Sequence, residues 1–167
     1  MNNINQDKTI NYAGYGLFVD QEFGRTLFGA NTPNFVVEQK GYELVVLEFK
    51  ELPEDIQKAV QPTFRIYAAR RNEGALVRLR VWRLTPVQRK LADHWNYGDI
   101  LYSRETFAPD INPRPIEIDV ITNHGIGKIV DGLNYEPYLN DRETVLGFAI
   151  EAQRNLEGQY YTSKERM

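Results

Sequence analysis

Short strand-like runs, with few helical stretches between them, constrain this chain most strongly. The runs cover residues 9–13, 42–49, 64–69, 75–84, 100–107 and 116–121. A turn is expected at Asn72-Glu73-Gly74, between the third run and the fourth. Parallel strands need a long crossover connection, usually a helix, between them. The pattern therefore predicts an α+β fold, with a mostly antiparallel, curled sheet or barrel and two or three helices packed on it.

The clearest helix start is the segment Thr-Pro-Val-Gln at residues 85–88. The threonine can cap the helix, the proline suits the first helical position, and the glutamine completes a capping box. Val87, Leu91 and Trp95 recur four residues apart, which predicts one apolar face. Gly98 is expected to end this helix.

Two further helices are predicted on either side of the strand-rich region. One follows Asp20, a plausible N-cap, and ends at Gly29. The other starts at Asn140 and closes at Gly158. Their apolar faces would consist of Phe23, Leu27 and Phe28 in the first helix and of Val145, Ala149, Ala152 and Leu156 in the second.

Composition excludes several classes of function. The chain has 167 residues, so we expect a single domain over residues 1–167, with residues 1–7 frayed and no secretory signal at the start. It contains no cysteine, which excludes thiolate chemistry and is compatible with the cytoplasm. The formal net charge of −3 argues against nucleic acid and against an anionic membrane surface. No apolar run approaches the roughly 20 residues of a membrane helix.

A glycine-rich turn precedes the first helix, in the segment Tyr15-Gly16-Leu17-Phe18-Val19-Asp20. Helix N-termini leave backbone N–H groups unpaired and favour negative charge, so such a turn can bind a small anion. Gly14 and Gly16 would let the backbone approach a ligand closely. The spacing alone favours the simpler interpretation, in which both glycines only form a tight turn, and leaves the anion site as the alternative.

Three segments, in order, are similar to the signature of one family. Residues 15–20 look like a Y-G-[ST]-L-x-D loop, and Gly41-Tyr42-Glu43-Leu44 resembles G-Y-x-L. Residues 81–96 are similar to a strand ending in L-T-P followed by a helix ending in L-D-x-x-E, with Ala92-Asp93 in place of L-D. Pro137-Tyr138-Leu139 and the last helix match a closing proline, tyrosine and helix. Together they resemble the γ-glutamylcyclotransferase-like family, also called the AIG2-like family.

The resemblance implies a small mixed, mainly antiparallel β-barrel flanked by two or three helices. It also implies a pocket for a small anionic γ-glutamyl or amino-acid-like ligand, and release of 5-oxoproline without metal or cofactor. The ligand-binding residues that it implies are Tyr15, Gly16, Leu17, Phe18 and Tyr138. Leu17 stands where the family has Ser or Thr, which removes a side-chain donor but leaves backbone donors. Tyr138 is as well explained as a core tyrosine with a bonded hydroxyl.

Asn96 falls on the position of the family's catalytic glutamate when the alignment runs without gaps from Leu84-Thr85-Pro86. A carboxylate there would carry the proton from the attacking amine to the leaving amine. An amide can only form hydrogen bonds. We therefore expect a protein that binds its ligand without cyclotransferase activity; the alternative is an active enzyme in which Asp93, Asp99 or Glu105 serves as a substitute base.

A third hypothesis comes from six arginines that lie among aromatic residues on two adjacent strands. They are Arg65, Arg70, Arg71, Arg78, Arg80 and Arg83. Such a face can bind single-stranded nucleic acid, draw an anionic small ligand toward the barrel, or simply be a solvated sheet surface balanced by acidic residues. The negative net charge favours the solvated surface. His94 and His124 show no metal-binding spacing.

Overall fold

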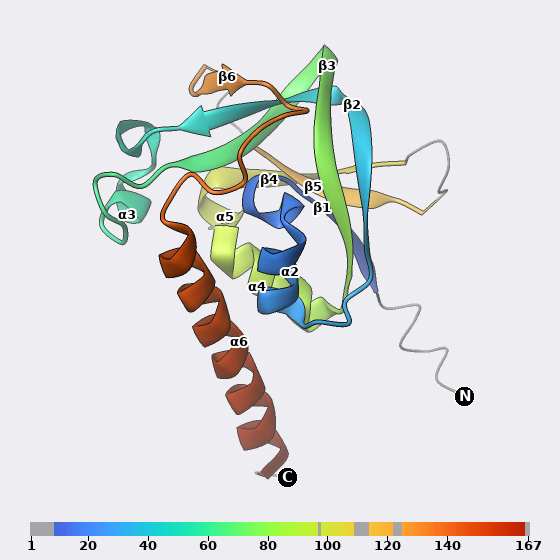
Figure 1. Ribbon diagram of the computed structural model, residues 1–167, viewed down its shortest axis with the longest axis vertical. Coiled ribbons are helices and arrows are strands. Elements are labelled where there is room, and N and C mark those ends of the chain that lie inside the picture. The colour runs from blue at the N-terminus through green and yellow to red at the C-terminus, as the bar shows by residue number, and fades with distance from the viewer. Residues whose placement is uncertain (1–8, 97, 109–113, 122–124, 166–167) are drawn as a thin grey trace.

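The computed structural model describes residues 9–96, 98–108, 114–121 and 125–165. These residues include a six-stranded sheet with the order β4-β5-β1-β3-β2-β6. The strands are β1 (Ile10–Gly14), β2 (Asn34–Leu47), β3 (Ile66–Leu84), β4 (Tyr102–Phe107), β5 (Ile116–Ile121) and β6 (Lys128–Val130). The sheet curls into a half-barrel with helices packed beside it (Figure 1). The predicted α+β class, with a mainly antiparallel curled sheet, is confirmed.

The long strands β2 and β3 pair antiparallel along most of their length. The turn predicted at Asn72-Glu73-Gly74 is wrong, because β3 runs on through it. The register shifts at this point: Lys40 pairs with Leu76, whereas the next residue, Gly41, pairs with Asn72. Residues 73–75 of β3, which lie between Asn72 and Leu76, form a bulge. Gly41 in β2 has a φ of 99°, a conformation that favours glycine. The turn-forming residues thus mark a bend in a continuous strand.

Strand β1 lies between β3 and β5 and has opposite relations to them. It pairs antiparallel with the last residues of β3 and parallel with the first residues of β5. β3 also meets β5 directly, at Ala69 opposite Val120. Because β3 bends at its bulge, its first residues lie near the end of β1, and Tyr67 of β3 contacts Gly16. The glycine-rich turn therefore sits against the start of a strand that is distant from it in sequence.

Two predicted helix starts are confirmed by their caps. Helix α2 (Gln21–Phe28) follows Asp20, whose Oδ2 accepts a hydrogen bond from the Phe23 N–H at 3.2 Å. Helix α4 (Pro86–Asn96) follows Thr85, whose hydroxyl accepts from the Gln88 N–H at 3.2 Å. The Gln88 side chain accepts in return from the Thr85 N–H at 2.9 Å. Both caps join residues that are three apart in the sequence, so the sequence pattern alone predicts them.

The inward face of α4 differs from the prediction. Val87 is 54% exposed, whereas Arg89 and Ala92 are buried. Leu91 and Trp95 pack, partly buried, against the core beneath the helix. Arg89 can occupy an inward position because carboxylates from the sheet compensate its charge.

Two glycines predicted to end helices do not end them. Gly98 instead begins the short helix α5 (Gly98–Leu101). Helix α6 (Arg142–Glu165) starts two residues after Asn140 and continues past Gly158. Its first turn is capped by Asp141, whose Oδ2 accepts from the N–H and the hydroxyl of Thr144, at 3.0 and 2.7 Å. A glycine stops a helix only where the chain turns left-handed; elsewhere it only weakens it.

Two hydrophobic clusters lie on opposite faces of the sheet. The first fills the half-barrel, and the second lies between the sheet and the helices α2, α4 and α6. Val81 belongs to the first and its neighbour Trp82 to the second, because successive side chains of a strand point to opposite faces. Short helical turns connect the elements: η1 (Gly16–Val19), η2 (Phe49–Glu51) and α3 (Glu54–Gln57). Within the described part of the chain, no helix combines the length and apolar character needed to cross a membrane.

Candidate functional site

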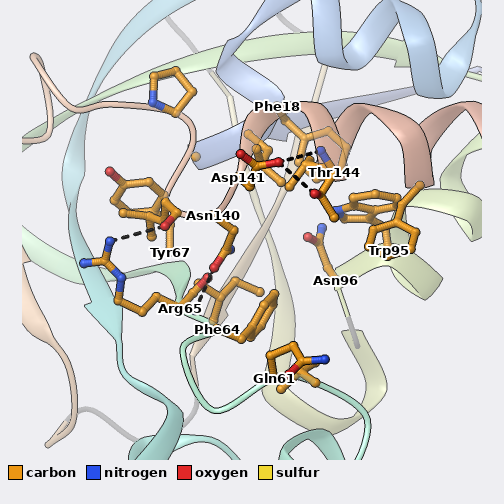
Figure 2. Close-up of a pocket in the computed structure, with 18 of the residues that line it drawn as sticks. Phe18, Gln61, Phe64, Arg65, Tyr67, Trp95, Asn96, Asn140, Asp141 and Thr144 are labelled. Atoms are coloured by element: carbon orange, nitrogen blue, oxygen red, sulfur yellow. Dashed lines mark hydrogen bonds between the residues drawn. The ribbon is translucent and has the colours of Figure 1, made fainter.

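A cavity of about 1050 Å³ opens between the barrel and the first turns of α6. Its wall combines the glycine-rich turn, the start of β3, the end of α4 and the start of α6. The wall consists of Tyr12, residues 15–18, 59–61, 63–67 and 94–96, Pro137, residues 139–141, Thr144, Val145, Phe148 and Ala152. Figure 2 shows Phe64 and Arg65 on one side of this space and Trp95 and Asn96 on the other.

The glycine-rich turn forms one part of this wall. Gly16 has a φ of 64°, and a Cβ there would lie 2.8 Å from Cδ2 of Tyr67. Glycine alone suits this combination of conformation and close approach. Gly14 has a different role, because a Cβ there would lie 2.3 Å from the Cβ of Phe18. One glycine therefore shapes the cavity wall, and the other makes room for a core side chain.

Side chains of β3 hold the turn in place. Arg80 donates from Nε to the Val19 carbonyl at 2.7 Å, and Trp82 donates from Nε1 to the Phe18 carbonyl at 2.9 Å. Trp82 is fully buried, so its bond is shielded from water. These two bonds fix the backbone of the turn, which reduces the conformational entropy that binding a ligand would cost.

Asn96 reaches the cavity from the last turn of α4 and contacts Tyr12. Its Nδ2 donates to the Tyr12 hydroxyl at 2.8 Å. Tyr12 is 1% exposed, and burial, followed by the charge of Asp119, raises the pKa of its phenol well above the ordinary value. Tyr12 therefore keeps its proton throughout the physiological range. This part of the wall is a neutral amide beside a neutral phenol.

Behind Tyr12 lies a group of charged side chains that we call the Arg89 cluster. It comprises Arg89, Asp93, Arg104, Glu117 and Asp119. The Arg89 guanidinium lies 4.3 Å from the centroid of the Tyr12 ring. It donates from Nε to Glu117 at 2.9 Å, from Nη1 to Asp93 at 2.7 Å and from Nη2 to Asp119 at 3.1 Å. Arg104, closer to solvent, donates to Asp93 at 2.7 Å.

Burial and charge act in opposite directions on the two most buried members of the cluster. Burial alone would lower the pKa of Arg89, but Tyr12 and the carboxylates raise it overall. Burial raises the pKa of Asp119, and the nearby Arg89 only partly offsets this effect. Oδ2 of Asp119 has no hydrogen-bond partner among the described residues. The cluster therefore holds a permanent cation next to an incompletely paired carboxyl group.

Arg65 brings a positive charge to the opposite side of the cavity. Its Nη2 donates to the Leu139 carbonyl at 3.2 Å, and its backbone exchanges two hydrogen bonds with the Asn140 side chain, at 3.2 and 2.8 Å. Its other guanidinium donors have no hydrogen-bond partner among the described residues, so they can bind an anion. Asp141 contributes a carboxylate to the wall, but that group caps α6, and its bonds to Thr144 lower its pKa.

The other sequence-predicted residues lie as follows. Tyr138 is not among the described wall residues; its hydroxyl donates to Oδ2 of Asp20 at 2.6 Å and ties the segment before α6 to the cap of α2. Glu105, on β4, accepts from Nε of Arg71 at 2.6 Å and is also not among them. The side chain of Asp99, like His124, lies outside the described residues.

Three residues gained importance only from the structure. Sequence reasoning does not single out Tyr12 or Arg89, and it treats Arg65 as one of six arginines. Arg89 and Asp93 carry a local signal, because opposite charges four residues apart meet on one helix face. The position of Tyr12 beside Asn96 has no such signal, since 84 residues separate them.

Comparison with solved structures identifies the architecture. An uncharacterized protein from Homo sapiens matches with a TM-score of 0.55 and 12% identity, over 90% of this chain and 87% of that one. A gamma-glutamyl cyclotransferase matches with a TM-score of 0.53 and 13% identity, over 89% of this chain and 86% of that one. No protein-family profile and no curated protein matches the sequence. The half-barrel with its helices is thus a γ-glutamylcyclotransferase-like fold, as the sequence motifs predicted.

Proposed function

We propose that this protein binds a small anionic γ-glutamyl or amino-acid-like ligand in the cavity and does not cyclise it. The observation that carries the proposal is the position of Asn96 on the cavity wall, together with residues 15–18. The sequence motifs assign that position to the proton-carrying glutamate. Its amide is neutral and bonded to a neutral phenol, so it cannot accept the proton of the attacking amine.

Arg65 and the turn at residues 15–18 support an anionic ligand. The guanidinium brings a positive charge to the cavity wall, to which residues 15–18 of the turn also belong. The aromatic and aliphatic residues between them suit a compact organic molecule. A location in the cytoplasm is compatible with the absence of cysteine.

The alternative is an active enzyme that releases 5-oxoproline from γ-glutamyl amines with a substitute base such as Asp99. It is favoured by the position of Asp99 three residues after Asn96, in the short helix α5. Glu105 is less suited to this role, because its carboxylate already binds Arg71. The alternative predicts that turnover survives Asn96→Ala and is lost in Asp99→Ala.

Nucleic acid remains a third candidate, and the partners of the six arginines argue against it. Arg65 binds Leu139, Arg70 binds Glu43, Arg71 binds Glu105, Arg78 lies near Glu38, Arg80 binds Val19 and Arg83 binds Thr9. Guanidinium groups bonded within the protein have fewer donors left for phosphates. Retention on single-stranded oligonucleotides, lost at modest salt, would restore this candidate.

The decisive experiment combines binding and turnover. The protein is incubated with a panel of γ-glutamyl dipeptides and amines, binding is followed by thermal shift, and 5-oxoproline is measured by mass spectrometry. We expect a shift without product. Arg65→Gln should weaken binding about tenfold, because it removes a charge-assisted hydrogen bond. Arg78→Gln, which changes a partly exposed arginine that is not among the described wall residues, is the matched control and should bind normally. Product release by the wild type would contradict the proposal.

A further inference from the structure

Asn96 and Tyr12 form a pair whose hydrogen-bonding capacity is only partly used. Asn96 is half-buried and Tyr12 is buried, and both belong to the cavity wall. The bond from Nδ2 of Asn96 to the Tyr12 hydroxyl occupies one amide N–H and one lone pair of the phenol. Within the described part of the chain, neither side chain forms another hydrogen bond.

The unused groups are one acceptor and one donor. Because the amide nitrogen of Asn96 is directed at Tyr12, its carbonyl oxygen is left as an acceptor. Because the Tyr12 oxygen accepts that bond, its own O–H is left as a donor. Burial keeps the pKa of Tyr12 well above its ordinary value, so the donor is present throughout the physiological range. A neutral acceptor and a neutral donor therefore stand next to each other on the wall.

This arrangement complements a carboxamide and opposes a carboxylate. A carboxamide offers an N–H to the Asn96 oxygen and a C=O to the Tyr12 hydroxyl. A carboxylate offers only acceptors, so one of its oxygens would face the Asn96 oxygen without a proton between them. The charges behind Tyr12 do not compensate, because the two guanidinium groups of the Arg89 cluster face three carboxylates.

We propose that Asn96 and Tyr12 form a subsite for a neutral side-chain amide, so that the cavity selects γ-carboxamides and γ-glutamyl amides over γ-carboxylates. The inference rests on the proposed function, because it concerns the same cavity. It assigns Asn96 a positive role: the residue that cannot carry a proton recognises the uncleaved amide bond. Tyr12 sets the orientation of the Asn96 amide and supplies the second bond.

Two nearly isosteric probes test the selectivity. L-Glutamine and L-glutamate differ only in the γ-amide and the γ-carboxylate, and isothermal titration calorimetry at neutral pH measures both affinities. We expect glutamine to bind at least about tenfold more tightly, because glutamate leaves polar groups unpaired or opposed. Asn96→Leu removes the acceptor at similar volume, and Tyr12→Phe removes the donor but keeps the ring over Arg89. Each should reduce the preference to within about threefold.

The controls separate failure of this inference from failure of the proposed function. Asn155→Leu, an exposed asparagine on α6 that is not among the described wall residues, should retain the full preference. Thermal unfolding of each variant checks that it is folded. Equal binding of both probes by the wild type overturns the amide subsite and leaves the binding function intact. Binding of neither probe, nor of a γ-glutamyl methylamide, overturns both. A preference that persists in folded Asn96→Leu and Tyr12→Phe also overturns the subsite.

Discussion

Tyr12 separates two polar regions that differ in how completely their hydrogen-bonding groups are used. On one side, Arg89 donates from Nε, Nη1 and Nη2 to three different carboxylates. On the other side, Asn96 and Tyr12 share a single bond and face the cavity. Buried polar groups that satisfy one another stabilise a fold, whereas groups left with unused capacity beside a cavity are available to a ligand. The comparison assigns stability to the Arg89 cluster and recognition to the cavity side.

Removing Arg89 should produce the largest effect on stability. Arg89→Met leaves Asp93, Glu117 and Asp119 close together without their buried cation, and breaking a buried ion pair from one side costs about 3–5 kcal/mol. Chemical denaturation measures the free energy of unfolding. Arg104→Met is the matched control: Arg104 is 44% exposed, so its loss should cost about 1 kcal/mol or less. Equal losses in the two variants would contradict the structural role of Arg89.

The contrast between these regions also shows which features the sequence could predict. The caps at Asp20 and Thr85 were predictable because both partners lie within three residues. The bulge in β3 was not, since a bulge is defined by its pairing with a second strand. The burial of Arg89 was not predictable either, because two of its three carboxylates come from β5.

The candidate site divides in the same way. Gly16 and Asn96 could be selected from local motifs, and both belong to the described cavity wall. The bond of Tyr138 to Asp20 spans 118 residues and could not be read from either segment. Tyr12, which the expected strand at residues 9–13 contained, gained a role only through the fold. Local motifs thus selected two residues of the cavity wall, while the contacts that these residues make required the tertiary structure.

The same glycine-to-alanine change should have opposite effects in the two helices that flank these regions. In α2, a Cβ at Gly24 would lie 2.0 Å from Cζ2 of the fully buried Trp82, so Gly24→Ala should cost about 1–3 kcal/mol through overpacking. In α6, a Cβ at Gly147 meets nothing within 4 Å, so Gly147→Ala should stabilise by roughly 0.5–1 kcal/mol. Thermal and denaturant unfolding of the two variants measure both signs. Destabilisation by Gly147→Ala would show that a side chain at position 147 does not have the free space around it that the structure shows.

Placing a carboxylate on the cavity side should convert recognition into chemistry. Asn96→Glu supplies the proton carrier that the sequence motifs assign to this position, and general acid–base catalysis contributes 10²–10⁴-fold where geometry is favourable. We expect release of 5-oxoproline from a γ-glutamyl amine at least about tenfold above the background rate measured with the wild type. Mass spectrometry detects the product. Asn96→Gln, which has the same length but no basic oxygen, should remain inactive. Activity in the glutamine variant would show that length at this position, and not proton transfer, limits turnover.

The smallest effect concerns the pH dependence of the Arg89 cluster. Burial raises the pKa of Asp119 in the folded state, so the folded protein holds this proton more tightly than the unfolded chain, where an aspartate titrates near pH ~3.9. Stability should therefore fall as pH rises from about 4 through the raised pKa. Asp119→Asn does not titrate there. Relative to this variant, the wild type should become less stable with increasing pH in urea unfolding.

Asp131 provides a control with the opposite sign. Backbone N–H groups, first that of Leu133, lower the pKa of this exposed aspartate, so its stabilising contribution is present above the unfolded pKa and is lost as pH falls through the lowered value. Relative to Asp131→Asn, the wild type should therefore become more stable with increasing pH. Parallel curves for the wild type and Asp119→Asn would mean that Arg89 fully compensates Asp119. Every carboxyl group of the Arg89 cluster would then be compensated by a guanidinium. The difference between this cluster and the Asn96–Tyr12 pair, whose hydrogen-bonding capacity is only partly used, would be larger.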